Sequence, residues 1–319
     1  FEQDIEEYLT TKGGYIKGNP KSFDRKLGLD KASFISFLKG SQPKTWERYE
    51  KIYGADSEKQ VIERFHREVK MVGLLRVLRQ GFIDRGIKFK AVFWKPETSI
   101  NGTTVKQYES NILHCTRQLH YSLNNENSID IVLFVNGIPI VSMELKCQFT
   151  GQSSANAIAQ YKFDRAGKDT IFTFKERVLV HFAVDLSRVY MTTRLEGAKT
   201  YFLPFNQGSN GAGKVGGQGN PINEDGYDTA YLWESVLCKD RLLEILHKYL
   251  HLQIERDDNG DIKSERMIFP RYHQLDIVTK LLEDVKENGS GKSYLIQHSA
   301  GSGKSNSIAW LAHRLSGLH

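Results

Sequence analysis

The segment "SIDIVLFVNGIPIVSMELK", residues 128–146, restricts the fold of this chain more than any other part of the sequence. Two apolar runs of strand length flank Asn136–Gly137, a dipeptide that favours a tight turn between antiparallel strands. The segment therefore predicts a β-hairpin. Asp130 lies near the start of the first strand, whereas Glu144 and Lys146 end the second strand and, being two residues apart, share one of its faces.

These three charged residues indicate a metal-dependent hydrolytic site. Hydrolysis of a phosphodiester with a divalent metal needs hard oxygen ligands, a positioned water and a cation near the developing negative charge. Asp130 and Glu144 are suited to hold the metal, and Lys146 is suited to supply the cation. The competing interpretation is that all three are solvated charges at strand ends. The apolar second strand weighs against it, because an unpaired charge in a buried strand is costly.

The register of the hairpin decides whether this site can form. With a simple two-residue turn and regular strands, Asp130 faces Met143, and Glu144 falls on the opposite surface of the sheet. With a longer turn or a bulge, Asp130 pairs with Glu144 and the three groups converge. We expect a three-residue turn with a bulge, because Gly137 permits a positive φ and Pro139 lacks the N–H that a regular ladder uses.

Two glycine-rich stretches match or nearly match the phosphate-binding pattern GxxxxGK. In "GSNGAGKV", residues 208–215, no apolar strand precedes the loop and no helix-forming sequence follows it, so we expect no phosphate there. "HSAGSGKS", residues 298–305, lies between the strand-like "SYLIQ" and the helical "NSIAWLAHRLS", the setting that such a loop needs, although His298 replaces the first glycine. The residues expected to bind ATP and its Mg²⁺ are Ala300, Gly301, Ser302, Gly303, Lys304 and Ser305.

A glutamine upstream of this loop supports a nucleotide site. "FPRYHQL" puts Gln274 at the start of a predicted helix. This arrangement resembles the Q motif of superfamily 2 helicases, in which a glutamine amide pairs with the adenine edge. Because the sequence stops shortly after Ser305, before any acidic Walker B strand, we expect a fragment of a longer motor protein that does not hydrolyse ATP efficiently by itself.

The hydrophobic pattern divides the chain into two parts. Helical periodicity dominates the first eighty residues, and period-two alternation follows Gly81. A helix pair is expected in "AYLWESVLC" and "DRLLEILHKYLHLQI", and the polar "ERDDNGDIKSE" after it predicts a domain boundary. The predicted domains are residues 1–255 and 256–319.

Charge and composition add two weaker indications. The formal net charge of +6 slightly favours a polyanionic partner. No apolar run reaches the roughly 18 residues of a membrane span, and three scattered cysteines give no disulfide framework, so we expect a cytosolic protein with no membrane partner.

The hairpin, followed by "AIAQYKFDR", resembles the PD-(D/E)xK nuclease core of the R subunits of type I restriction enzymes, with Ile129 in place of the proline. "RVYMTT", "YLWESVL" and "FPRYHQLDIVTKLL", leading to "QHSAGSGKSNSIAWLAHRLS", resemble that family in the same order. The resemblance implies an α/β fold. A PD-(D/E)xK restriction-endonuclease-like domain, with a mixed sheet flanked by helices, would precede the start of a RecA-like superfamily 2 helicase domain.

The resemblance also implies roles for individual residues. Asp130 and Glu144 would be metal ligands, Lys146 the catalytic lysine and Gln160 a supporting glutamine. Relatives often show QxxxY there, whereas this chain has Asp164 four residues after Gln160. Lys162 and Arg165 lie near the expected cleft and are candidates for holding phosphates. An acidic ligand from an early helix is common in this fold, and the candidates left open are Glu2, Glu6, Glu7 and Glu63.

The implied function is that of the DNA-cleaving and translocating subunit of a bacterial or archaeal type I restriction-modification system. It would hydrolyse phosphodiesters of double-stranded DNA with Mg²⁺, coupled to ATP-driven translocation, beside methylation (M) and specificity (S) subunits. Two alternatives stay open: an N-terminal domain that only grips DNA for a superfamily 2 helicase, and a module that docks the R subunit onto its methyltransferase partner. The pair His247 and His251, with no third ligand, predicts solvated helix residues and not a metal site.

Overall fold

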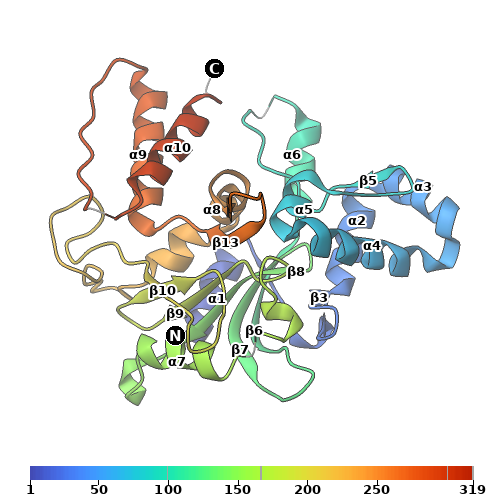
Figure 1. Ribbon diagram of the computed structural model, residues 1–319, viewed down its shortest axis with the longest axis horizontal. Coiled ribbons are helices and arrows are strands. Elements are labelled where there is room, and N and C mark those ends of the chain that lie inside the picture. The colour runs from blue at the N-terminus through green and yellow to red at the C-terminus, as the bar shows by residue number, and fades with distance from the viewer. Residues whose placement is uncertain (99, 166, 300, 318–319) are drawn as a thin grey trace.

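The computed structural model describes the whole chain except residues 99, 166, 300 and 318–319. Its centre is a seven-stranded mixed sheet in the order β1-β6-β7-β8-β9-β10-β11 (Figure 1). The strands are β1 (Ile16–Lys17), β6 (Leu113–His120), β7 (Ser128–Val135), β8 (Ile138–Leu145), β9 (Val180–Val184), β10 (Val189–Thr192) and β11 (Leu203–Pro204). β1 pairs in parallel with β6 and β8 with β9, whereas the other neighbours are antiparallel. The α/β fold predicted from the sequence is confirmed.

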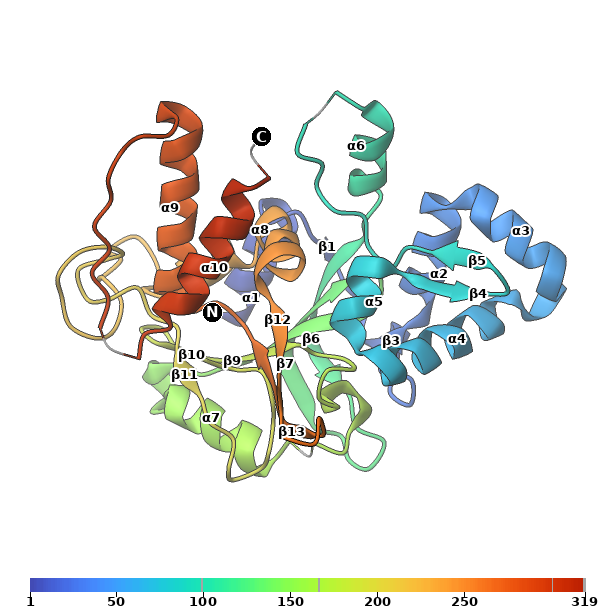
Figure 2. The ribbon, with the colours of Figure 1, turned by 45° about the horizontal axis from the view of Figure 1, so that its top comes forward.

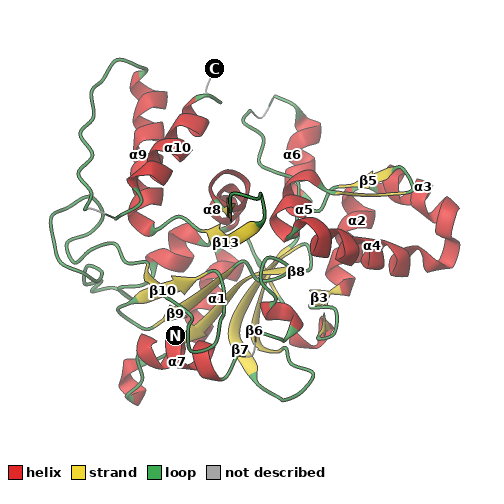
Figure 3. Cartoon of the chain, in the orientation of Figure 1, coloured by secondary structure: helices red, strands yellow, loops and turns green. Residues whose placement is uncertain are grey.

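Helices cover both faces of this sheet (Figure 3). α1 (Glu2–Thr11) packs Ile5 and Leu9 into the larger core, which also contains alternate residues of β7 and β8. α7 (Ser154–Phe163) packs Ala157 and Tyr161 into a second core on the other face. Because successive strand residues point to opposite faces, β7 contributes side chains to both cores. The buried hydrophobic side chains of β8 lie in the larger core.

A helical layer with two short hairpins lies to one side of the sheet (Figure 2). Its helices are α2 (Lys31–Ser41), α3 (Pro43–Tyr53), α4 (Ser57–Val72) and α5 (Leu74–Gln80). The hairpins β2 (Phe23–Asp24) with β3 (Leu29–Asp30), and β4 (Phe82–Asp84) with β5 (Ile87–Phe89), accompany them. The periodic segment 57–80 forms two helices and not one, because Gly73 adopts φ +82° and ends α4. α6 (Gly102–Glu109) precedes β6.

Two sequence predictions about the last third of the chain are wrong. The helix expected in "DRLLEILHKYLHLQI" ends at Tyr249, after α8 (Lys239–Glu244) and a π-helical turn, and β12 (His251–Arg256) follows it. β12 pairs with β13 (Ile262–Ile268), so the predicted boundary segment contains the turn of this hairpin. The "SYLIQ" segment is not a strand, and Leu295 is 95% exposed. Within the described ranges no strand pairs with this segment. A buried strand needs neighbouring strands, because its backbone N–H and C=O groups must form hydrogen bonds.

The C-terminal helices α9 (Tyr272–Asn288) and α10 (Lys304–Leu315) pack against the same core as the preceding residues. Trp310 of α10 is buried, and its indole N–H donates to the carbonyl oxygen of Tyr249 at 2.8 Å. The predicted boundary between a domain of residues 1–255 and a domain of residues 256–319 stays a prediction. Of the helices that the structure describes, none is long and apolar enough to cross a membrane.

Two buried histidines are expected to make stability depend on pH. Burial lowers the pKa of His114 to about 4, against the opposing charge of Asp30, and lowers the pKa of His181 to about 3. Since the neutral forms are favoured by folding, the stabilisation is complete above the unfolded pKa of 6.5 and is lost as the pH falls through the window toward 4. Each histidine contributes up to about 1.4 kcal/mol per pH unit in that window.

Urea unfolding at pH 7.5 and 5.5 checks this expectation. Buried Glu144, whose pKa is raised to about 8, opposes this loss in the same window, because its carboxyl takes up a proton more readily in the folded chain. The comparison is therefore between variants: His181→Gln should lose less free energy of unfolding between the two pH values than the unmodified protein does. His313→Gln is the control, because His313 is exposed on α10. An equal change in the free energy of unfolding for His181→Gln and the unmodified protein would contradict the prediction.

Candidate functional site

The β7–β8 hairpin has the offset register that the site requires. Val135 pairs with Ile138 across Asn136 and Gly137, so the turn has two residues, and both take positive φ, +52° and +80°. The register then shifts next to Phe134, which pairs with Pro139. The predicted bulge is confirmed, whereas the predicted three-residue turn is wrong.

The extra residue lies inside β8. Leu133 pairs with Val141, which leaves Ile140 without a partner of its own on β7, directly after Pro139. Since proline has no N–H to give to the ladder, a bulge beside it sacrifices little hydrogen bonding. Ile131 then faces Met143, and continuing the register one step sets Asp130 beside Glu144.

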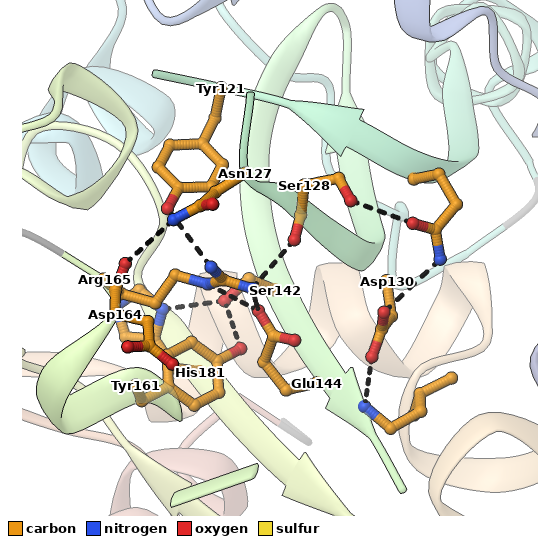
Figure 4. Close-up of polar contacts among 12 residues, drawn as sticks. Tyr121, Asn127, Ser128, Asp130, Ser142, Glu144, Tyr161, Asp164, Arg165 and His181 are labelled. Carbon is orange, nitrogen blue, oxygen red and sulfur yellow. Dashed lines mark hydrogen bonds and ion pairs between the residues drawn. The ribbon is translucent and has the colours of Figure 1, made fainter. Parts of the chain in front are cut away.

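Asp130 is fixed by two hydrogen bonds at the edge of the site (Figure 4). Its Oδ2 accepts the backbone N–H of Leu145 at 2.7 Å, and its Oδ1 accepts from the amide of Gln118 at 3.3 Å. Burial raises the pKa of Asp130, although the Leu145 N–H and the Lys146 charge oppose the rise. The carboxylate therefore has a set orientation toward β8.

Glu144 is completely buried and is held by Arg165. Its Oε1 accepts from Nη2 of Arg165 at 2.7 Å and from Nε at 2.8 Å (Figure 4). Its Oε2 is buried and has no hydrogen-bond partner in the part of the chain that the structure describes. Burial raises the pKa of Glu144 to about 8, with Arg165 acting in the opposite direction. One oxygen of this carboxylate is thus engaged, and the other is free.

Lys146 follows β8 and is half-buried. Its backbone N–H donates to Val184 O at 2.8 Å, which extends the pairing with β9 to this residue. Its ammonium is close enough to Asp130 and Glu144 to lower the pKa of both, against the larger effect of burial. The three residues singled out in the hairpin therefore lie within electrostatic reach of one another.

Gln160 has a different position from these three. It is half-buried on α7, and none of the described side-chain hydrogen bonds joins it to Asp130, Glu144 or Lys146. The adjacent Tyr161 is buried instead, and its hydroxyl lies 2.8 Å from Oγ of Ser142. Ser142 also contacts Nδ1 of His181 at 2.8 Å. The supporting role of Gln160 stays a prediction.

Two further polar residues, Gln118 and Glu2, lie close to Asp130. Gln118 was not identified from the sequence. Gln118 adopts φ +49° in β6, where the pairing passes from Arg117 to Leu119. Positive φ at a residue other than glycine is uncommon. This local irregularity lets the Gln118 amide donate both to Asp130 and to Glu2 Oε2, at 3.0 Å. No local pattern in the sequence signals this positive φ.

Among the four early acidic candidates, Glu2 is the one that the structure brings to Asp130. The Glu2 charge contributes to the raised pKa of Asp130, after the effect of burial. Glu6 instead contacts Lys17 at 3.0 Å, and Glu7 and Glu63 are exposed. A ligand role for Glu2 is a proposal that this arrangement supports.

Arg165 corrects one sequence expectation. It was expected to be available to DNA phosphates, but it is 4% exposed and its guanidinium is bound to Glu144. Lys162, on α7, is half-buried.

The expectation for the histidine pair was also wrong in part. His247 and His251 lie on different elements, and the ring of His247 stacks on the ring of Trp94 with the two centroids 4.6 Å apart.

The donor set fits a hard divalent cation such as Mg²⁺. Over the described residues, no three His, Cys, Asp or Glu side chains are grouped to form a complete metal cage. Mg²⁺ does not need one, because it commonly binds through one or two carboxylates and keeps several waters. The unpartnered buried Oε2 of Glu144, with Asp130 on the adjacent strand, offers that kind of site.

The second candidate site surrounds the N-terminus of α10. Gly301 and Gly303 adopt φ +73° and +82°, and the helix begins at Lys304. The ammonium of Lys304 donates to the carbonyl oxygens of His298 and Ser299, at 3.1 and 3.0 Å. The helix predicted after this loop is therefore present, whereas the strand predicted before it is not found among the described residues. Ser305 is exposed at the start of α10, and Ala300 lies outside the described residues.

Gln274 supports the same loop. It is 3% exposed, and its side-chain amide donates to Gly303 O at 2.8 Å and to Ser302 O at 3.3 Å. Its carbonyl accepts the N–H of Arg271 at 2.9 Å, which closes the first turn of α9. Contact with adenine stays a prediction. Around Lys214, by contrast, the described chain forms turns and no helix begins.

A mixed sheet that carries two carboxylates on one hairpin, with a lysine directly after it, defines an α/β protein with a candidate site at the open end of that hairpin. Residues 2–200 match the family model described as "Type I restriction enzyme R protein N terminus". The chain belongs to this family, as its resemblance predicted.

Two relatives from Methanocaldococcus jannaschii are named as endonuclease subunits of the type I restriction enzymes MjaVIIIP and MjaVIIP. They are 25% identical over 224 residues and 26% identical over 220 residues, and each alignment covers 65% of this chain. The matched part spans only 19% and 18% of the two relatives' lengths.

Proposed function

We propose that this chain contains the DNA-cleaving centre of a type I restriction enzyme R subunit, formed by Asp130, Glu144 and Lys146. The offset register of the hairpin carries the proposal, because it sets Asp130 beside Glu144 on neighbouring strands. Family membership and the names of the two relatives support a restriction role. The substrate is double-stranded DNA, and the reaction is hydrolysis of a phosphodiester bond.

The chain's own residues supply orientation and charge. Asp130 and the free Oε2 of Glu144 would hold Mg²⁺, which when bound polarises a phosphoryl oxygen and makes a bound water more acidic. The Leu145 N–H keeps Asp130 turned toward β8. Lys146 places a positive charge beside the phosphate, where negative charge develops during attack.

The loop at residues 298–305, supported by Gln274, is proposed to bind ATP with Mg²⁺ in the complete protein. A helix N-terminus with glycines at positive φ favours a phosphate group. In the complete R subunit, ATP hydrolysis would drive DNA translocation, and cleavage would occur at the β7–β8 centre. The M and S subunits are the proposed partners, with sequence recognition outside this chain.

A second candidate function is a domain that grips DNA or docks a partner without cutting. The observation that favours it is the ion pair of Arg165 with Glu144, which occupies one oxygen of a proposed ligand. In that case Asp130 and Lys146 would have no part in chemistry. Cleavage assays on the assembled complex separate the two candidates.

The test is cleavage of plasmid DNA by the complete R subunit with its M and S partners, in Mg²⁺ and ATP. Asp130→Asn is expected to abolish cleavage and to leave ATP hydrolysis at its normal rate, because the carboxylate is lost without a change of shape. Asp258→Asn, in the exposed turn between β12 and β13, is the matched control. Normal cleavage by the Asp130 variant would refute the proposed centre and favour the gripping domain.

A further inference from the structure

Arg165 is bound on every side by groups from different parts of the fold. It follows α7, and its guanidinium reaches Glu144 on β8, the carbonyl oxygen of Ser128 on β7 at 2.8 Å and the hydroxyl of Tyr121 at 3.4 Å (Figure 4). The guanidinium carbon also lies 5.5 Å from the centre of the Tyr121 ring. The planar fork of donors is thereby fixed in one orientation.

The way in which Arg165 contacts Glu144 is unusual for a neutralising pair. An arginine that only neutralises a carboxylate commonly uses two parallel bonds, one to each oxygen. Here Nε and Nη2 both reach Oε1, at 2.8 and 2.7 Å. Oε2 is left buried and without a partner among the described residues, which is costly unless another group binds it.

The surroundings of Oε2 indicate what that group is. Asp130 adds negative charge, since its carboxylate contributes to the raised pKa of Glu144. Figure 4 draws the free oxygen of Glu144 on the side of Asp130, away from Arg165. A buried carboxylate oxygen beside a second carboxylate attracts a cation, whereas it repels another hydrogen-bond acceptor.

We infer that Arg165 is a positioning residue that immobilises Oε1 of Glu144 and so reserves Oε2 for the divalent cation. The inference rests on the proposed function, because it takes Glu144 as a metal ligand. Arg165 itself does not touch the metal or the DNA. The Ser128 and Tyr121 contacts matter because they fix the guanidinium, which in turn fixes the carboxylate.

The experiment measures Mn²⁺ binding to the complete R subunit by electron paramagnetic resonance, without DNA or nucleotide. Replacing a residue that orients a metal ligand commonly weakens metal binding by about 10- to 100-fold. Arg165→Met is expected to reach the upper end of this range and Arg165→Lys the lower end, because lysine keeps the charge and loses the fork. Tyr121→Phe, which removes one contact of the guanidinium, is expected to weaken binding about two- to three-fold.

Three outcomes are distinguishable. If Glu144→Gln retains Mn²⁺ binding at this site, the proposed metal centre fails, and the inference about Arg165 fails with it. If Glu144→Gln loses binding while the Arg165 and Tyr121 variants bind normally or more tightly, only the role of Arg165 is overturned. Graded weakening in the order Tyr121→Phe, Arg165→Lys, Arg165→Met supports it. If Arg165→Met does not fold, the other two variants decide.

Discussion

Lys146→Met is expected to lower the rate of DNA cleavage by the assembled restriction complex by about 100-fold or more, while ATP hydrolysis continues. Methionine keeps most of the side-chain volume of this half-buried residue and removes its charge. The loss follows from electrostatic stabilisation of the transition state, for which removing one group commonly costs about 10²- to 10³-fold. Lys146 lowers the pKa of both Asp130 and Glu144, against the larger effect of burial, and stands outside the buried ion pair.

The measurement is the rate of linearisation of a plasmid with one recognition site, under excess enzyme. Lys106→Met is the matched control, because Lys106 is exposed on α6. Lys146→Arg is expected to retain part of the rate, since it keeps a positive charge on β8's end. Cleavage at the normal rate by Lys146→Met would show that this ammonium has no part in the reaction.

Gly137→Ala is expected to lower the free energy of unfolding by about 3–5 kcal/mol, in the range of severe single substitutions. Gly137 adopts φ +80°, which an alanine tolerates poorly. A Cβ atom there would also lie 2.4 Å from Asp30 O and 2.6 Å from Phe34 N. Both are backbone atoms at the N-terminus of α2, so neither can turn aside as a flexible side chain can.

Gly86→Ala separates these two effects. Gly86 also lies in a hairpin turn, between β4 and β5, at φ +76°, but no atom lies within 4 Å of its added Cβ. It is expected to cost only the conformational strain, about 1–2 kcal/mol. Urea unfolding of the two variants gives the comparison. Equal losses of unfolding free energy in the two variants would mean that the close approach of α2 to the turn does not affect stability.

The Gly137 contact has a consequence for the candidate site. The N–H of Asp30 donates to Gly137 O at 2.9 Å, so the hairpin turn is bonded directly to the start of α2. The same hairpin carries Asp130 and Glu144 at its open end. A variant that shifts the turn is therefore expected to reduce both stability and cleavage.

Local sequence was sufficient where a residue's neighbours in the chain decide its conformation. The strands of the hairpin lie at residues 128–135 and 138–145, as the apolar runs predicted, and Asn136–Gly137 forms the turn. The helix after the second glycine loop begins at Lys304, as the adjacent sequence predicted. Family membership followed from motifs and their order, and the family match over residues 2–200 confirmed it.

Only the tertiary structure decided which distant groups meet. Arg165 contacts Glu144 across 21 residues, and Glu2 reaches the Gln118 amide across 116, with no periodic pattern that links them. The position of the extra residue in β8 depends on β7 and on what packs against both faces of the sheet. The segment 293–297 has strand-like composition and yet no strand partner within the described chain. Pairing and ionisation depend on neighbours in space, and the linear pattern records only neighbours along the chain.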